Sequence, residues 1–133
     1  MCESIPLISV VMSVYKEPEN MIRQSIESIL YQTFGNFEFI IILDCPNYEG
    51  NSIVEEYAKN DDRIHVIHNT DNLGLTVSLN KGLMYAKGKY IARMDADDIS
   101  EACRFEIQYS YMEKHLNVTV VGSYVDGFDE KGN

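Results

Sequence analysis

The chain alternates between short apolar runs and longer segments in which apolar residues recur at helical spacing. The runs "LISVVMSV" (7–14) and "FEFIIIL" (37–43) are almost wholly apolar and rich in β-branched residues. Such runs are typical of strands that are buried on both faces of a sheet. Three shorter runs predict further strands, at 63–67, 89–94 and 118–122.

Four helices are predicted between these strands. Pro18 is well placed for the first turn of one helix, along which Ile22, Ile26 and Ile29 form an apolar stripe. Leucines at intervals of four mark another helix, for which Gly88 is a suitable C-terminal cap. The leucine-marked helix is predicted over 75–88, and the other two predicted ranges are about 52–59 and 101–114.

Regular alternation of strands and helices predicts a three-layer α/β/α sandwich with a mainly parallel, Rossmann-like sheet. The length of 133 residues suits one domain, over 1–133, and no repeat or linker divides it. In such sheets, ligands bind beyond the carboxyl ends of the strands. Candidate chemistry is therefore sought where each strand ends.

The charge balance restricts the possible partners. With 21 acidic and 11 basic residues the net charge is −10, which argues against nucleic acid and anionic membrane surfaces. A divalent cation could still bridge such a protein to phosphate. Cys2, Cys45 and Cys103 show no metal-ligand spacing, and the chain has neither a membrane-span pattern nor a signal-peptide pattern. We therefore expect a reduced, cytoplasmic protein without a transmembrane segment.

Polar residues follow three of the predicted strands. Ser13 and Tyr15 end the first, Asp44 ends the second, and "MDADD" (94–98) ends the fourth. Because parallel strands end at one edge of the sheet, these residues are predicted to share a site.

Three aspartates, Asp95, Asp97 and Asp98, are crowded into this last stretch. Asp98 and Ser100 are well placed to cap the following helix, but capping does not account for Asp95 and Asp97. Hard carboxylate oxygens suit Mn²⁺ or Mg²⁺, which proteins hold with one or two carboxylates plus substrate phosphates. The cluster therefore predicts a metal site.

Three other uses of aspartate fit less well. An EF-hand beginning at Asp95 would need an oxygen ligand at Ile99 and a glycine at Ser100, and it would follow a helix. A receiver-type phosphorylation domain needs an acidic pair at the end of the first strand, which is absent. A haloacid-dehalogenase-type phosphatase would carry its D-x-D on the first strand instead of the fourth.

Five segments in register carry a family resemblance. The chain resembles, over essentially its whole length, the nucleotide-binding half of family 2 glycosyltransferases of the GT-A fold. It looks most like members that build bacterial exopolysaccharide or lipopolysaccharide. The segments are "ISVVMSVYKEPE", "SIESILYQTF", "FEFIIILD", "NTDNLGLTVSLNKGLMYAKGKYIARMDADD" and "RFEIQYSYMEKH…VVGS".

The resemblance implies roles for individual residues in binding a nucleotide-sugar donor. Asp44 matches the acid that accepts a hydrogen bond from the imide N–H of uracil, which suits an acceptor-only carboxylate. Asp97 is implied as the direct metal ligand, and Asp95 as a further metal ligand or a contact to ribose or metal-bound water. Asn80 and Lys81 either reach the ribose or phosphate or form a solvated helix face. The remaining implied nucleotide contacts are Ser13, Tyr15, Glu17, Asn72 and Gly74.

The sequence also departs from the family pattern. Leu43 precedes Asp44 where many relatives have two acids, and Cys45 stands where relatives often have glycine. The chain ends at Asn133, whereas the family's catalytic domain continues and carries the catalytic base. We therefore expect the N-terminal part of a longer catalytic domain, without a catalytic base of its own. Its uncovered sheet edge would favour self-association.

The resemblance implies metal-dependent transfer of a sugar from a nucleotide-diphosphate donor to a hydroxyl of a glycan or lipid-linked glycan. The expected donor is a UDP-sugar. The role would be bacterial cell-surface polysaccharide synthesis, in the cytoplasm or at the inner face of the membrane. The alternative is a non-catalytic nucleotide-binding or interaction module of the same fold. The sugar, the linkage and the stereochemical course are not fixed by these residues.

Overall fold

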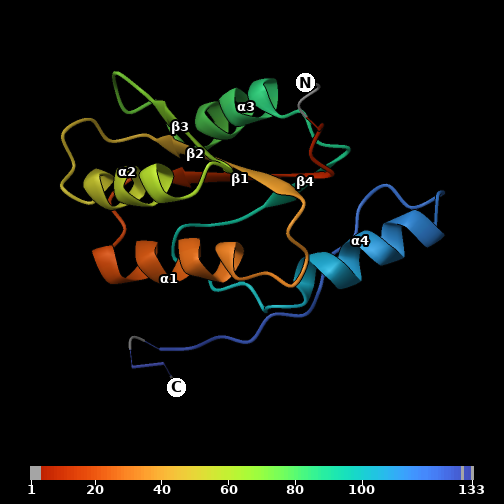
Figure 1. Ribbon diagram of the computed structural model, residues 1–133. Coiled ribbons are helices and arrows are strands. Elements are labelled where there is room, and N and C mark those ends of the chain that lie inside the picture. Colours follow the sequence, from red (N-terminus) through yellow and green to blue (C-terminus); the bar gives the residue numbers. More distant parts are fainter. Residues whose placement is uncertain (1–3, 130, 133) are drawn as a thin grey trace.

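The computed structural model describes residues 4–129 and 131–132 and has three layers (Figure 1). A four-stranded, all-parallel sheet has the order β3-β2-β1-β4. One helix, α3, covers one face, and α1, α2 and α4 cover the other. The strands are β1 (Ile8–Val14), β2 (Phe37–Leu43), β3 (Ile64–His68) and β4 (Tyr90–Arg93). The helices are α1 (Glu19–Leu30), α2 (Asn51–Asn60), α3 (Leu75–Tyr85) and α4 (Arg104–Lys114).

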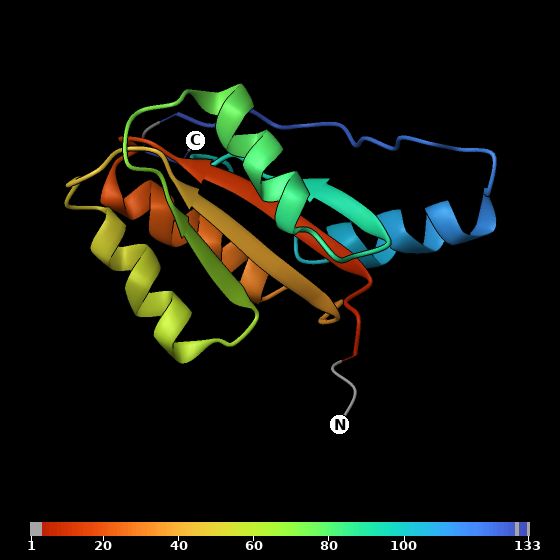
Figure 2. The same cartoon turned by 90° about the horizontal axis from the view of Figure 1, so that it is seen from above.

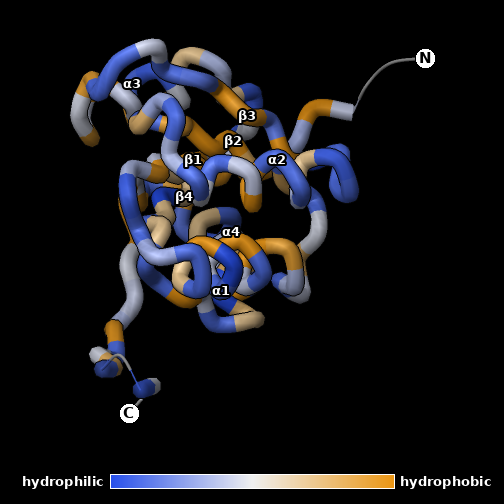
Figure 3. Tube along the Cα trace, turned by 90° about the vertical axis from the view of Figure 1, so that its left-hand side faces the viewer, coloured by the Kyte–Doolittle hydropathy of each residue, from blue (hydrophilic) through white to orange (hydrophobic). Residues whose placement is uncertain are grey.

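The two central strands explain the apolar runs of the sequence. Every residue of β1 and β2 is buried. Alternate side chains pack toward α1, α2 and α4 in the larger core cluster, and Val11, Ile40 and Ile42 pack on the opposite side, against Leu79 of α3. Figure 2 shows α3 lying across the strands, and Figure 3 shows the hydrophobic trace of the sheet enclosed by more polar helices. The predicted α/β sandwich is confirmed.

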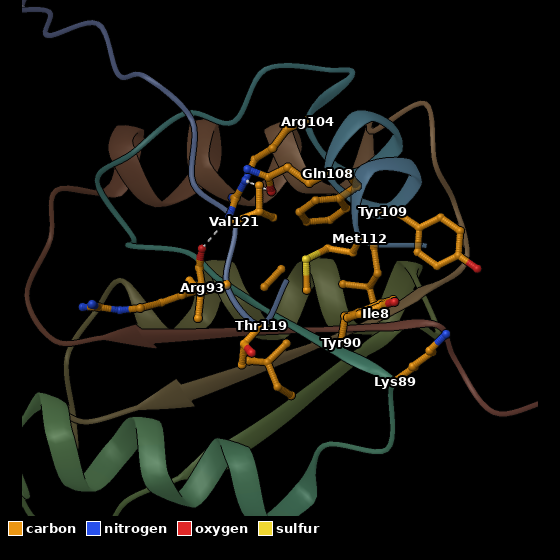
Figure 4. A pocket seen from close by; sticks show the side chains of 14 residues that line it. Ile8, Lys89, Tyr90, Arg93, Arg104, Gln108, Tyr109, Met112, Thr119 and Val121 are labelled. Carbon is orange, nitrogen blue, oxygen red and sulfur yellow. Dashed lines mark hydrogen bonds between the residues drawn. The ribbon is translucent and has the colours of Figure 1, made fainter. Parts of the chain in front are cut away.

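The predicted fifth strand is wrong. Residues 118–122, which lie within the described part of the chain, form no strand, and the sheet ends at β4, which pairs with β1 alone. The β-branched composition favours an extended backbone, but a strand also needs a partner for its N–H and C=O groups. Thr119 and Val121 instead line a groove beside β4 and α4 (Figure 4), and Val120 is 84% exposed.

The predicted cap at Gly88 is also wrong, because α3 ends at Tyr85 with Ala86 as its C-cap. Gly88 lies against the start of β1, where its N–H donates to Ser9 Oγ at 2.8 Å. A Cβ added at this position would lie 2.6 Å from the Ser9 backbone nitrogen. The glycine is therefore required for close approach between backbones.

We expect Gly88→Ala to lower the free energy of unfolding by roughly 2–3 kcal/mol, because the new methyl group meets backbone atoms that cannot move aside cheaply. Urea denaturation measures the effect. Gly127→Ala is the matched control, since a Cβ there meets nothing within 4 Å, and it should be near neutral. Equal stability of the two variants would show that the connection before β4 relaxes freely.

Two helix starts differ from the sequence-based expectation. Pro18 is the N-cap of α1, and its carbonyl accepts hydrogen bonds from the N–H groups of Met21 and Ile22. Helix α4 begins at Arg104, not at 101, and its N-cap is Cys103 without a side-chain capping bond.

Cys45 and Cys103 are free thiols, and Cys2 lies outside the described residues. None of the helices in the described chain has the length and apolar character that a bilayer crossing requires.

Candidate functional site

The carboxyl ends of the strands meet as the sequence predicts. Val14 at the end of β1 pairs with Leu43 at the end of β2, and the Asp44 N–H donates to the Val14 carbonyl at 2.8 Å. On the other side of β1, the Met94 N–H donates to the Val11 carbonyl at 3.1 Å. Asp44 and the acidic stretch after β4 therefore flank β1 at the same edge of the sheet.

The acidic cluster of Asp95, Asp97 and Asp98 is compact. Each residue offers a carboxylate oxygen, and these oxygens all lie within 4.8 Å of one another. Asp95 is half-buried, whereas Asp97 and Asp98 are exposed. Although Asp98 is exposed overall, partial desolvation of its carboxyl group raises its pKa; the neighbouring charges of Asp95 and Asp97 raise the pKa further, and Arg104 lowers it. Three hard oxygen ligands this close together fit a divalent cation such as Mn²⁺ or Mg²⁺.

The cluster lies on a turn and does not cap a helix. The Asp98 N–H donates to the Asp95 carbonyl at 3.2 Å, and α4 begins only at Arg104. The prediction that Asp98 and Ser100 cap the helix is therefore wrong, because an irregular stretch separates them from its first turn. Arg104 reaches back over this stretch and donates from Nη2 to the Arg93 carbonyl at 3.0 Å (Figure 4). Its positive charge lies beside the cluster and moderates the repulsion there.

Asp44 is the centre of a second, buried group. Its Oδ1 accepts hydrogen bonds from Asn69 Nδ2 at 2.7 Å and from the Leu73 N–H at 2.8 Å. Its Oδ2 accepts one from the Gly74 N–H at 3.0 Å. Burial alone would raise the pKa of Asp44, but these hydrogen bonds favour the carboxylate and hold the pKa below its usual value.

This carboxylate organises the loop between β3 and α3. Asp44 is only 3% exposed, and the loop residues Leu73 and Gly74 fold over it. Gly74 has a φ of +87°, which favours glycine, and a Cβ there would meet nothing within 4 Å. Its requirement is therefore the backbone conformation. Asn72 is exposed, and its Oδ1 accepts from the Gly74 N–H at 3.2 Å.

Three implied nucleotide contacts, Ser13, Tyr15 and Glu17, lie at and just after the end of β1, next to Asp44. Ser13 is buried at the end of the strand, and the Tyr15 side chain is partly open, with the residue 38% exposed. Glu17 folds the turn back, because its Oε2 accepts from the Tyr15 N–H at 2.8 Å. Tyr48 donates to the Glu17 carbonyl and ties this turn to the loop after β2.

The two residues predicted on α3, Asn80 and Lys81, lie in different environments. Asn80 is exposed, as a solvated helix face would be. Lys81 points inward, where its Nζ donates to Asn69 Oδ1 at 2.6 Å. This bond orients the Asn69 amide so that its Nδ2 donates to Asp44 and Ser78. Sequence reasoning missed Asn69, although its place directly after β3, on the same edge as the other candidates, was a usable signal.

Sequence reasoning also missed three polar residues of α1. Ser25, Ser28 and Gln32 recur at intervals of three and four, beside the apolar stripe of the same helix. The Ser25 side chain contacts the backbone of the acidic cluster, and those of Ser28 and Gln32 contact the backbone that follows it.

The protein has an open parallel sheet with charged groups at its carboxyl edge. This arrangement is typical of α/β proteins that bind ligands beyond the strand ends. The family model described as glycosyl transferase family 2 matches residues 9–133, so the chain belongs to glycosyl transferase family 2. An uncharacterized glycosyltransferase of Methanocaldococcus jannaschii is 48% identical over 129 residues, which are 96% of this chain and 44% of that protein. The amylovoran biosynthesis glycosyltransferase AmsE of Erwinia amylovora is 38% identical over 128 residues, 95% of this chain and 48% of that protein. The chain thus spans less than half the length of these curated relatives.

Solved structures share the fold. S. aureus TarS 1-349 superposes with a TM-score of 0.75 at 25% identity, over 83% of this chain and 33% of that one. The same protein has been solved with UDP and with UDP-GlcNAc. The mannosyltransferase PcManGT of Pyrobaculum calidifontis, in complex with GDP-Man and Mn²⁺, has a TM-score of 0.64 at 21% identity, over 72% of this chain and 29% of that one. The PcManGT likeness supports the fold alone.

Proposed function

We propose that these 133 residues form the donor-binding domain of a metal-dependent glycosyltransferase, which moves a sugar from a UDP-sugar to a hydroxyl of a glycan or lipid-linked glycan. The carrying observation is that the acidic cluster and the Asp44 group flank β1 at one edge of the sheet, in a chain of glycosyl transferase family 2. The name of AmsE supports a role in cell-surface polysaccharide synthesis, and the TarS complexes support UDP as the donor nucleotide.

In this proposal the acidic cluster holds the cation. Asp97 is exposed and makes the direct contact, while Asp95 is braced by Arg93, whose Nη2 lies 3.4 Å from Asp95 Oδ1. When bound, Mn²⁺ or Mg²⁺ supplies positive charge that stabilises the diphosphate leaving group. Because the acidic residues would hold this cation, a protein of net charge −10 could still bind a diphosphate.

The other half of the proposed site selects the base. The partly exposed Tyr15 ring offers a flat surface on which a base can stack. Asp44 Oδ2 accepts only one of the hydrogen bonds described above and keeps capacity for the imide N–H of uracil. Because Asp44 is buried, this contact requires the loop Asn72–Gly74 to shift, and that loop is exposed. Ser13, Glu17 and Asn80 stay proposed contacts around the nucleotide.

Calorimetric titration of UDP, with Mn²⁺ and then with EDTA, tests the proposed function. We expect binding in Mn²⁺ that EDTA removes, because the carboxylates alone repel the diphosphate. GDP and ADP are the matched controls and should bind more weakly, since neither offers the uracil imide to Asp44. Binding that ignores EDTA, or no binding in Mn²⁺, would contradict the proposal. The family's catalytic base is expected outside these residues, so binding is the appropriate readout.

A further inference from the structure

Helix α1 carries a line of three polar side chains, Ser25, Ser28 and Gln32, which we call the α1 polar row. Their spacing places them on one side of the helix. Ser25 is 0% exposed and Gln32 is 7% exposed, and Ser28 between them is half-buried. Buried polar groups persist when they are hydrogen-bonded, and each member of the row has partners in the stretch between β4 and α4.

Ser25 contacts the acidic cluster itself. Its Oγ donates to the Asp95 carbonyl at 2.9 Å, and the same carbonyl accepts the Asp98 N–H that closes the turn. The hydroxyl also lies 3.3 Å from Met12 Sδ, a weaker acceptor. The Asp95 carbonyl belongs to the peptide that joins Asp95 to Ala96, and Ala96 is buried. Fixing this peptide restrains Asp95 directly and Asp97 through the turn that the Asp98 N–H closes.

The rest of the row holds the chain beyond the cluster. Ser28 Oγ accepts from the Ser100 N–H at 3.0 Å. Gln32 Nε2 donates to the Glu101 carbonyl at 2.6 Å, and its Oε1 accepts from the Phe105 N–H at 3.0 Å. The stretch from the cluster to the first turn of α4 is therefore attached to α1 at successive turns of that helix.

This attachment opposes the repulsion within the cluster. Carboxylates within 4.8 Å of one another separate unless the backbone holds them, and the stretch 95–103 is irregular. Bonds from a packed helix supply the missing constraint. A cation site whose ligands are already held together binds more tightly, since less order has to be imposed when the ion arrives.

We propose that Ser25 is a positioning residue, which presets the acidic cluster for a divalent cation through the Asp95 carbonyl. The inference rests on the proposed function, because that function supplies the cation. Ser25 is fully buried and is not itself a ligand. Ser28 and Gln32 extend the same support along the backbone.

The test compares Ser25→Ala with wild type by Mn²⁺ titration, with free Mn²⁺ followed by electron paramagnetic resonance and no nucleotide present. We expect the Kd for Mn²⁺ to rise about tenfold, the usual effect of removing a group that orients ligands. Ser52→Ala is the matched control. Ser52, on α2, also donates from Oγ to a backbone carbonyl, that of Glu49 at 2.9 Å, but this carbonyl is not part of the acidic cluster. Its Kd should equal that of wild type.

A second variant guards against a misfolded protein. Ser25→Cys keeps nearly the same volume and a weak donor, so its Kd should lie between those of wild type and Ser25→Ala. Circular dichroism confirms folding of each variant. A folded Ser25→Ala protein with a Kd within about twofold of wild type would overturn the proposal.

Amide hydrogen exchange separates this inference from the proposed function. Faster exchange of the Asp98 N–H in Ser25→Ala, without metal, is expected if Ser25 holds the turn. If wild type binds no Mn²⁺ either alone or with UDP present, the proposed metal-dependent function fails. Unchanged exchange at Asp98 would overturn the positioning role in either case.

Discussion

Replacing Asp97 with alanine is expected to abolish metal-dependent binding of UDP. Asp97 is the exposed member of the D-x-D pair, and its carboxylate lies within 4.8 Å of the other two. Losing a direct ligand should weaken Mn²⁺ binding by at least ~100-fold, since groups that only orient ligands already contribute about 10–100-fold. Calorimetry with UDP and Mn²⁺, together with the paramagnetic titration of Mn²⁺ alone, measures both effects.

The control for this variant is Asp62→Ala. Asp62 is exposed and precedes β3, so it lies at the amino-terminal edge of the sheet, opposite the acidic cluster. It removes the same charge and should leave both affinities unchanged. Unaltered UDP affinity in Asp97→Ala, with EDTA still abolishing binding in wild type, would place the cation on other residues.

Asp44→Asn is expected to lower the free energy of unfolding by about 2–3 kcal/mol, the range for losing hydrogen bonds to a charged group. The carboxylate accepts from Asn69, Leu73 and Gly74, and an amide would point its NH₂ group at one or more of these donors. Urea denaturation at neutral pH measures the loss. Asp71→Asn, an exposed change in the same loop, should be near neutral.

The effect of Asp44 should depend on pH in a defined direction. Its pKa is lowered in the folded state from the ordinary value of 3.8, so the carboxylate stabilises the fold fully above that value. The contribution is lost as the pH falls through the lower, folded-state pKa. The stability difference between wild type and Asp44→Asn should therefore be constant near neutrality and shrink in acid. A difference that persists unchanged into strong acid would show that packing, not charge, causes it.

Local patterns predicted most of the fold because its central elements are locally unambiguous. β1 and β2 are buried on both faces, and their sequences are correspondingly apolar throughout. The segment 118–122 has similar composition but forms no strand, since strand formation depends on a partner elsewhere in the chain. Gly88 was misplaced for a related reason, because its neighbour Ser9 is distant in sequence.

The residues of the candidate site likewise divide into those that the sequence predicted and those that it did not. The placement of Asp44 and the acidic cluster on either side of β1 at one edge of the sheet followed from parallel topology. Ser25 gave no comparable signal, because a small polar residue in a helix looks like many others, whereas Asn69 had the usable signal of its place directly after β3. Their importance depends on partners that only the folded chain brings near, such as the Asp95 carbonyl for Ser25.

The attachment of the acidic cluster to α1 has a consequence for how the protein is made. The Ser25 hydroxyl and the Asp95 carbonyl are 70 residues apart in the chain. The two strands beside β1 also come from different distances along the chain, because Ile8 pairs with Phe37 of β2 and with the much later Tyr90 of β4. Contacts between distant residues form slowly, because a long loop must close before they are gained. During synthesis on the ribosome, β1, α1 and β2 can therefore pack together while the aspartates are still being translated. We therefore expect the cation-binding half of the site to form after the half that is built around Asp44.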